Sequence, residues 1–263
     1  PDGDLRGISF SADSQYLSFY VNADNSPSNL FVWKLSEAKA ERLTQALDKA
    51  LDESVLVTSE VVRYPSFDDL AIPALLYKPK QASSSAKVPA LIWIHGGPGG
   101  QSRTGYSPAI QHLVNQGYAV LAVNNRGSSG YGKTFFHQDD LKHGEDDLQD
   151  IVYGKKYLQS LNWIDSERIG VIGGSYGGYL VNWIAGHSSK YKALISHAGV
   201  YNLLSQFASD STLHRPAAYG GSPWQNKDKL QQVNPAMFAE NFSIPMLVTH
   251  GELDYRVPVT QGL

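Results

Sequence analysis

The sequence predicts an α/β protein with a mostly parallel, doubly wound sheet. From residue 90 onward, short segments that are apolar throughout alternate with helical patterns. Strands of this kind, joined by helices, are typical of a parallel sheet that is covered on both faces. In such a sheet, the catalytic loops are expected at the carboxyl ends of the strands.

The individual elements follow from this alternation. The predicted strands are 90–95, 119–124, 168–173, 193–197 and 246–250. The predicted helices are 107–116, 145–161 and 179–186, with a turn around 234–238. Before the first of these strands, residues 55–78 predict a hairpin with its turn at 67–70.

The first 55 residues have a different pattern. They contain short β runs at 7–10, 16–22 and 30–35, and turn residues separate these runs at 12–14 and 25–29. This pattern predicts one four-stranded blade of a β-propeller, which by itself cannot bury both of its faces. We therefore expect a propeller remnant and linker at 1–55, followed by the α/β domain at 56–263.

Composition excludes several classes of function. The formal net charge of -3 and the pI near 6.3 provide no basic field for nucleic acid or an anionic membrane. The absence of cysteine excludes disulfides, a thiolate nucleophile and Cys-based zinc sites. No apolar stretch reaches 18 residues, so no transmembrane helix is expected. The compartment stays open, cytoplasmic or periplasmic and secreted, and a homo-oligomer is compatible with the sequence.

Ser175 lies in the run 173–179, Gly-Gly-Ser-Tyr-Gly-Gly-Tyr, between a predicted strand and a predicted helix. A G-x-S-x-G match alone is weak, but this strand–turn–helix context is the one that a nucleophile elbow requires. A Cβ at Gly173 or Gly177 would collide where strand and helix cross closely. The context predicts a serine hydrolase of the α/β-hydrolase fold, with Ser175 as the nucleophile.

A glycine-rich loop, 95–100, follows the first core strand. An oxyanion hole in this architecture uses two backbone amides, one on the residue after the nucleophile and one on a loop after an early strand. We therefore expect the amides of Tyr176 and Gly97 to stabilise the oxyanion.

Asp254 follows the fifth predicted strand, where the order of nucleophile, acid and histidine in this fold places the acid. Nine residues follow Asp254 and none is histidine. All of the histidines precede Asp254; they are His95, His112, His137, His143, His187, His197, His214 and His250. We expect the base and the last strand of a C-terminally incomplete sheet to lie beyond Leu263, and His95 and His250 to order loops through hydrogen bonds.

A group of acids at Glu145, Asp146, Asp147 and Asp150 invites a metal interpretation. We reject it, because acids in the first turn of a helix are favoured by the helix dipole and the rest are expected to face solvent. No metal and no cofactor are expected.

Taken together, these motifs resemble the prolyl oligopeptidase family of serine peptidases, and most of all its acylaminoacyl-peptidase and dipeptidyl-peptidase branch. The matching runs are 95–98, 125–132, 173–179, 197–200 and 250–258. The resemblance implies a peptidase that hydrolyses short peptides through an acyl-enzyme, with a propeller before the hydrolase domain. It places the catalytic histidine about thirty residues after the acid.

The resemblance also assigns Arg256 to binding a substrate carbonyl, which suits the fixed donors of a guanidinium. Tyr201 and Phe207 follow the predicted strand 193–197. They are candidates for lining the pocket for the residue before the scissile bond, and core packing is an equally good explanation for both.

Two alternatives remain. One is a carboxylesterase on the same fold, since the nucleophile machinery is shared; the blade-like segment and the run 254–258 argue against it. The other is a catalytically dead hydrolase-fold scaffold that only binds, which the missing histidine favours if Leu263 is the natural end.

Overall fold

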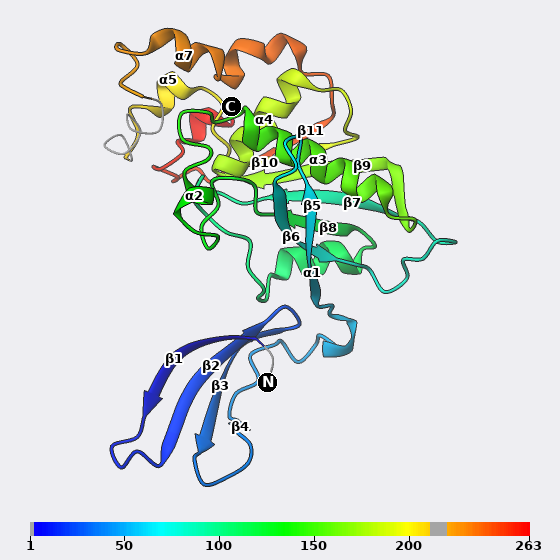
Figure 1. Cartoon of the computed structure of the whole chain (residues 1–263), viewed down its shortest axis with the longest axis vertical. Helices are drawn as coiled ribbons and strands as arrows, with labels where there is room; N and C mark the ends of the chain where they lie inside the picture. The colour runs from blue at the N-terminus through cyan, green and yellow to red at the C-terminus, as the bar shows by residue number, and fades with distance from the viewer. Residues whose placement is uncertain (1–2, 211–219) are drawn as a thin grey trace.

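The computed structural model of the chain describes residues 3–210 and 220–263. Two sheets organise these residues (Figure 1): a small antiparallel sheet near the N-terminus and a larger sheet of seven strands flanked by helices. No helix within the described ranges has the length and apolar character needed to cross a membrane.

The small sheet has the order β1-β2-β3-β4, with neighbouring strands antiparallel, and it confirms the expected blade. Its strands are β1 (Asp4–Phe10), β2 (Tyr16–Ala23), β3 (Ser26–Lys34) and β4 (Glu41–Arg42). The turn expected at 25–29 is shorter, because Ser26 already pairs with Ala23. Asn29, which contributed to that expectation, is buried and accepts hydrogen bonds from Thr44 and Ala46 of the following segment.

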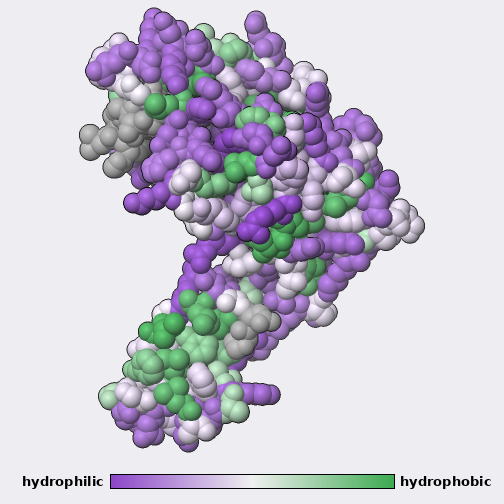
Figure 2. Space-filling view, viewed as in Figure 1, coloured by the Kyte–Doolittle hydropathy of each residue, from purple (hydrophilic) through white to green (hydrophobic). Residues whose placement is uncertain are grey.

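One blade leaves apolar side chains uncovered. Figure 2 shows hydrophobic residues gathered over the small sheet. Large exposed side chains from β1 and β2 are Leu5, Ile8, Phe10, Tyr16 and Tyr20. This agrees with the expectation that a single blade cannot bury both faces.

The large sheet has the strand order β11-β10-β9-β7-β8-β6-β5. β5 and β6 form the expected antiparallel hairpin, β6 pairs antiparallel with β8, and the remaining neighbours are parallel. The strands are β5 (Ser59–Pro65), β6 (Ala71–Tyr77), β7 (Val88–Ile94), β8 (Ala119–Val123), β9 (Ile164–Gly174), β10 (Leu194–His197) and β11 (Met246–Thr249). All five strands predicted from residue 90 onward are therefore present.

Helices cover both faces of this sheet. The α-helices are α1 (Pro108–Asn115), α2 (Lys133–Phe136), α3 (Asp146–Ser160), α4 (Tyr176–His187), α5 (Leu203–Gln206) and α7 (Lys227–Gln232), and the 3₁₀ helices are η1 (Glu53–Val55), η3 (Pro235–Asn241) and η4 (Val259–Gln261). On one face, α1 packs against Leu75 and Val120. On the other, α3 and α4 pack against Ile92 and Val171. The alternation of side chains along each strand supplies both cores.

α4 begins three residues earlier than predicted, at Tyr176 rather than 179. Gly177 and Gly178 are poor helix formers, so local propensity places the start after them. In the structure both glycines are buried in the first turn of α4, and tertiary packing overrides the propensity.

The strand register places the loops of interest at one edge of the sheet. Ile94 of β7 pairs with Gly173, Gly174 of β9 pairs with His197, and His197 of β10 pairs with Thr249 of β11. These parallel strands therefore end side by side, and the segments that follow them leave from the same edge.

Candidate active site

Ser175 lies at the turn between β9 and α4, with φ 57° and ψ -116°. Its N–H donates a 3.0 Å hydrogen bond to the carbonyl oxygen of His197, and its own carbonyl oxygen accepts the N–H of Tyr179 at 3.0 Å. A positive φ at a residue other than glycine costs energy and persists only where the surroundings enforce it. The backbone at Ser175 therefore has the sharp geometry of a nucleophile elbow.

The glycines around Ser175 allow this geometry. A Cβ at Gly173 would overlap the carbonyl oxygen of Gly177, and a Cβ at Gly177 would overlap that of Ile94 in β7. The collisions expected from the sequence are therefore confirmed. Close crossing of β9, β7 and α4 accounts for both glycines.

The glycine-rich loop after β7 lies directly against Ser175. A Cβ at Gly96 would come within 3.2 Å of the Ser175 Cβ and 3.7 Å of its Oγ. The next residue, Gly97, is exposed and has φ +140°, a conformation in which a side chain would overlap the amides of Gly99 and Gly100. The loop thus approaches the Ser175 hydroxyl at half-buried Gly96 and is exposed at the next residue, and the oxyanion roles of Gly97 and Tyr176 stay predictions.

His95 orders this loop, as expected. Its Nδ1 is 2.8 Å from the Gly96 carbonyl oxygen, and its Nε2 is 2.8 Å from Oγ of Ser128. Burial lowers the pKa of His95. A second link joins the same two loops, because the N–H of Ser129 donates to the Gly100 carbonyl oxygen at 2.9 Å.

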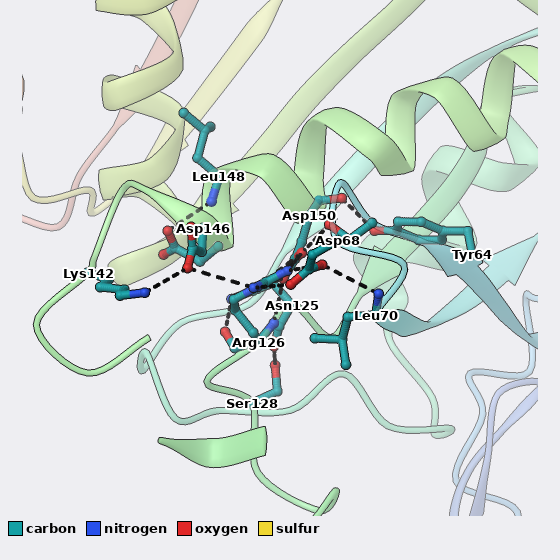
Figure 3. A network of polar contacts seen from close by, with 12 residues as sticks. Tyr64, Asp68, Leu70, Asn125, Arg126, Ser128, Lys142, Asp146, Leu148 and Asp150 are labelled. Atoms are coloured by element: carbon teal, nitrogen blue, oxygen red, sulfur yellow. Dashed lines mark hydrogen bonds and ion pairs between the residues drawn. The ribbon is translucent and has the colours of Figure 1, made fainter. Parts of the chain in front are cut away.

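Arg126 anchors the loop that contains Ser128 (Figure 3). Its guanidinium, with a side chain only 4% exposed, lies 2.9 Å from fully buried Asp150 of α3 and 3.0 Å from Asp68 of the β5–β6 turn. Burial opposes the charge of Arg126, but hydrogen bonds to Asp150 and Asp68 raise its pKa. Arg126 lies within the motif run 125–132, and no local feature of the sequence indicates this buried network.

Asp146 and Asp147 lie in the first turn of α3, as expected, but the expectation that the remaining acid faces solvent is wrong for Asp150. Asp147 and Asp150 are both fully buried, while Glu145 is exposed. Asp150 binds Arg126, and Asp147 accepts hydrogen bonds from two backbone amides and one hydroxyl. The spacing of the apolar residues in α3 was the signal that could have revealed the burial of Asp147 and Asp150, because all of the buried residues share one helical face. The buried residues are Asp147, Asp150, Ile151, Gly154 and Leu158. Within the described ranges, no group of three or more acids and histidines is placed to hold a metal ion.

Asp254 lies in the loop after β11. Its Oδ1 accepts the N–H groups of Arg256 at 3.0 Å and Val257 at 2.9 Å. Its Oδ2 lies 4.0 Å from Nε2 of His250, and that ring nitrogen is 2.7 Å from the Val257 carbonyl oxygen. His250 therefore orders the Asp254 loop, as expected. The triad role of Asp254 remains a prediction, and His214 lies outside the described residues.

The three predicted substrate-binding residues are distributed around this loop. Arg256 is 68% exposed and its Nε lies 3.3 Å from Asp210. Tyr201 donates its N–H to Gln261 at 2.9 Å, and its ring packs edge-on against Phe242. Phe207 packs edge-on against Trp224, which is 78% exposed. Their substrate-binding roles stay predictions.

Comparison with protein families gives two matches. Residues 104–263, which include Ser175 and Asp254, match the model described as "Prolyl oligopeptidase family". Residues 19–164 match the model described as "Platelet-activating factor acetylhydrolase, isoform II". The second match ends before the elbow.

Relatives and solved structures agree with the first match. Dipeptidyl-peptidase 5 of Schizosaccharomyces pombe is 33% identical over 90% of this chain and 37% of its own length. Acylaminoacyl peptidase of Pyrococcus horikoshii superposes with a TM-score of 0.86 at 29% identity, over 98% of this chain and 41% of that one. An acylaminoacyl peptidase in complex with Z-Gly-Gly-Phe-chloromethyl ketone has a TM-score of 0.75 at 25% identity, over 99% of this chain and 48% of that one. The chain thus spans less than half the length of these relatives.

Proposed function

Since the chain belongs to the prolyl oligopeptidase family, we propose that the protein carrying it is a serine peptidase that hydrolyses short peptides through an acyl-enzyme. The observation that carries this proposal is the contact between the two loops of the site. The glycine-rich loop passes so close to the elbow that a Cβ at Gly96 would lie 3.2 Å from the Cβ of Ser175, and this places loop backbone where an oxyanion donor is needed.

In the proposed reaction, Oγ of Ser175 forms a bond to the peptide carbonyl carbon and its proton passes to a histidine base. The N–H groups of Tyr176 and Gly97 donate to the oxyanion. The histidine then protonates the leaving amine as the peptide bond breaks. Water then attacks the acyl carbon while the histidine takes its proton; the bond to Oγ breaks, the peptide acid leaves, and Oγ of Ser175 receives the proton back.

Asp254 orients the histidine and stabilises its charged form in this proposal. We place that histidine outside the 263 residues, because none follows Asp254 and the chain spans only 37% of its relative from Schizosaccharomyces pombe. Arg256 is proposed to bind a substrate carbonyl, and Tyr201 and Phe207 to line the pocket before the scissile bond. The inhibitor in the related acylaminoacyl peptidase complex is peptide-like, which supports peptide substrates here.

Labelling with a fluorophosphonate probe tests the nucleophile. In the full-length protein, Ser175 should label, and Ser175→Ala should abolish labelling and lower kcat by a factor on the order of 10⁶. Retention of a tenth of the activity would exclude Ser175 as the nucleophile. Residues 1–263 alone should not label rapidly, because a serine without its base is a poor nucleophile. Efficient labelling of that piece would mean that one of its own histidines serves as the base.

Ester hydrolysis is the second candidate, favoured by the match of residues 19–164 to an acetylhydrolase family. Values of kcat/KM for a peptidyl amide and for a short-chain acyl ester distinguish the two. A strong preference for the ester, with no measurable amide cleavage, would replace peptidase by esterase. Absence of turnover and of labelling in the full-length protein would instead indicate a binding scaffold.

A further inference from the structure

A buried carboxylate lies behind the nucleophile elbow. The hydroxyl of Tyr176 donates a 2.5 Å hydrogen bond to Oδ2 of Asp147. Oδ1 of Asp147 accepts the N–H groups of Gly144 and Leu148, each at 2.8 Å. Because the two backbone donors fix the carboxylate at the start of α3, the Tyr176 hydroxyl meets an acceptor that has little freedom to move.

Tyr176 is the residue that follows the nucleophile, and its N–H is an oxyanion donor in the proposed mechanism. Its side chain is 7% exposed and its ring packs edge-on against His143 with 5.3 Å between centroids. A tyrosine side chain has two torsions, and each occupies few states. Holding the hydroxyl therefore restrains the backbone of the same residue, including the direction of its N–H.

The elbow needs such restraint. Ser175 has a positive φ, and a strained backbone persists only where the surrounding contacts over-determine it. On the sheet side, the Ser175 N–H is bonded to His197. On the helix side, the hydrogen bond to Asp147 holds Tyr176, the residue after Ser175.

We propose that Asp147 is a positioning residue for the reaction at Ser175: through the Tyr176 hydroxyl it holds the elbow in the geometry that aims the Tyr176 N–H at the oxyanion. This inference rests on the proposed function, since it concerns the oxyanion donor of that mechanism. Asp150, one turn further along α3, bonds to Arg126 and not to the elbow, and it provides the contrast of a buried aspartate with a structural role.

The charge of Asp147 matters, because a hydrogen bond to a carboxylate is stronger than one to a neutral acid. Around it lie Tyr176 from α4, and His143 and Asp139 from the segment before α3, with His143 Nε2 3.4 Å from Asp139. Burial raises the pKa of Asp147 to about 6, although the Tyr176 hydrogen bond opposes the shift. The hydrogen bond that restrains Tyr176 should accordingly be strong above pH 6 and weaker below it.

The test uses Tyr176→Phe, Asp147→Asn and the double variant in the full-length protein. At pH 8, each single change should lower kcat about tenfold with KM within about twofold, since an oxyanion donor acts in the transition state. The double variant should lose no more than the worse single variant. Affinity for a peptidyl trifluoromethyl ketone, whose tetrahedral adduct carries the oxyanion, should fall by the same factor as kcat.

The pH profile provides a readout that a structural role would not move. The ratio of wild-type kcat to Asp147→Asn kcat should shrink from about tenfold at pH 8 toward one below pH 5, while titration of the shared histidine base cancels in the ratio. Asp150→Asn is the matched control, with a lower Tm and a kcat within about twofold of wild type at a temperature where both are folded.

An unchanged kcat in Tyr176→Phe would overturn the inference, and so would a kcat ratio that stays constant with pH. If Asp147→Asn does not fold, Tyr176→Phe decides alone, because it keeps the ring and the amide. If wild-type protein labels at Ser175 and Tyr176→Phe has a normal kcat, this inference is overturned and the proposed function is not. Wild-type protein that fails to label would remove the proposed function as well.

Discussion

The hydroxyl of Tyr77 donates a 2.9 Å hydrogen bond to Oδ1 of Asp24, a residue 53 positions earlier in the chain. Asp24 lies in the turn between β2 and β3 and is 5% exposed, whereas Tyr77 ends β6 of the large sheet. The same carboxylate accepts the N–H of Gly105 at 2.9 Å and both the N–H and the hydroxyl of Ser59. The buried side chain of Asp24 therefore joins the blade to the α/β sheet and to the segment after β7.

Replacing Asp24 by alanine should lower the free energy of unfolding of the full-length protein by about 3 kcal/mol, because buried donors lose their acceptor. Urea denaturation measures the effect. Asp13→Ala is the control, since Asp13 lies in the exposed turn between β1 and β2 and only local groups bond to it. Equal effects of the two substitutions would mean that the Asp24 contacts add nothing to stability.

Breaking the buried ion pair of Arg126 and Asp150 should lower the free energy of unfolding more than breaking an exposed ion pair does. Arg126→Met leaves the Asp150 carboxyl buried without its cation, and should cost about 3–5 kcal/mol of unfolding free energy. Combining Arg126→Met with Asp150→Leu should recover part of this loss, because the buried carboxyl that lacks a cation is then removed. Arg168→Met, which breaks an exposed pair with Asp165, is the control and should have little effect. A small loss in Arg126→Met would contradict the anchoring role of Arg126.

Asp147 should make the stability of the protein fall as pH rises from about 4 to about 6. Burial raises the pKa of Asp147 in the folded state to about 6, above its value of 3.8 in an exposed chain. In this window the folded state binds more protons than the unfolded state, so the free energy of unfolding decreases with pH. The shift corresponds to about 3 kcal/mol.

This dependence is measured as the difference in unfolding free energy between wild type and Asp147→Asn at pH 4 and pH 7. Asp147→Asn lacks the ionisation, so its disadvantage relative to wild type should be smaller at pH 7 than at pH 4. The opposite trend would show that the folded state stabilises the charged form of Asp147, contrary to its burial.

Arg256→Ala should lower kcat/KM for peptide substrates about tenfold in the full-length enzyme, mainly through KM, if its guanidinium binds a substrate carbonyl. Stability should barely change, because Arg256 is 68% exposed. Asp210→Ala removes the ion-pair partner and leaves the guanidinium, so KM should stay within about twofold. Normal kinetics in Arg256→Ala combined with a lower Tm would mean that Arg256 has a structural role, through its ion pair with Asp210, and does not bind substrate.

Local patterns along the chain were sufficient to predict the succession of strands and helices and the place of the elbow. Apolar runs and helical patterns are local properties, and they located the strands after residue 90 and the turn at Ser175. The resemblance to the prolyl oligopeptidase family was likewise present in the motifs, and the family match confirms it.

The burial of polar residues and the identity of their partners depend instead on contacts between segments that are distant in the chain. The helix dipole explained Asp147, and Asp150 was expected to face solvent, because the dipole and charge of a helix start are visible locally while the partners of these acids are not. Arg126 lies 24 positions before Asp150, and Tyr176 lies 29 positions after Asp147. No local pattern encodes such distant contacts, since they arise when separate loops and helices are brought to one edge of the sheet.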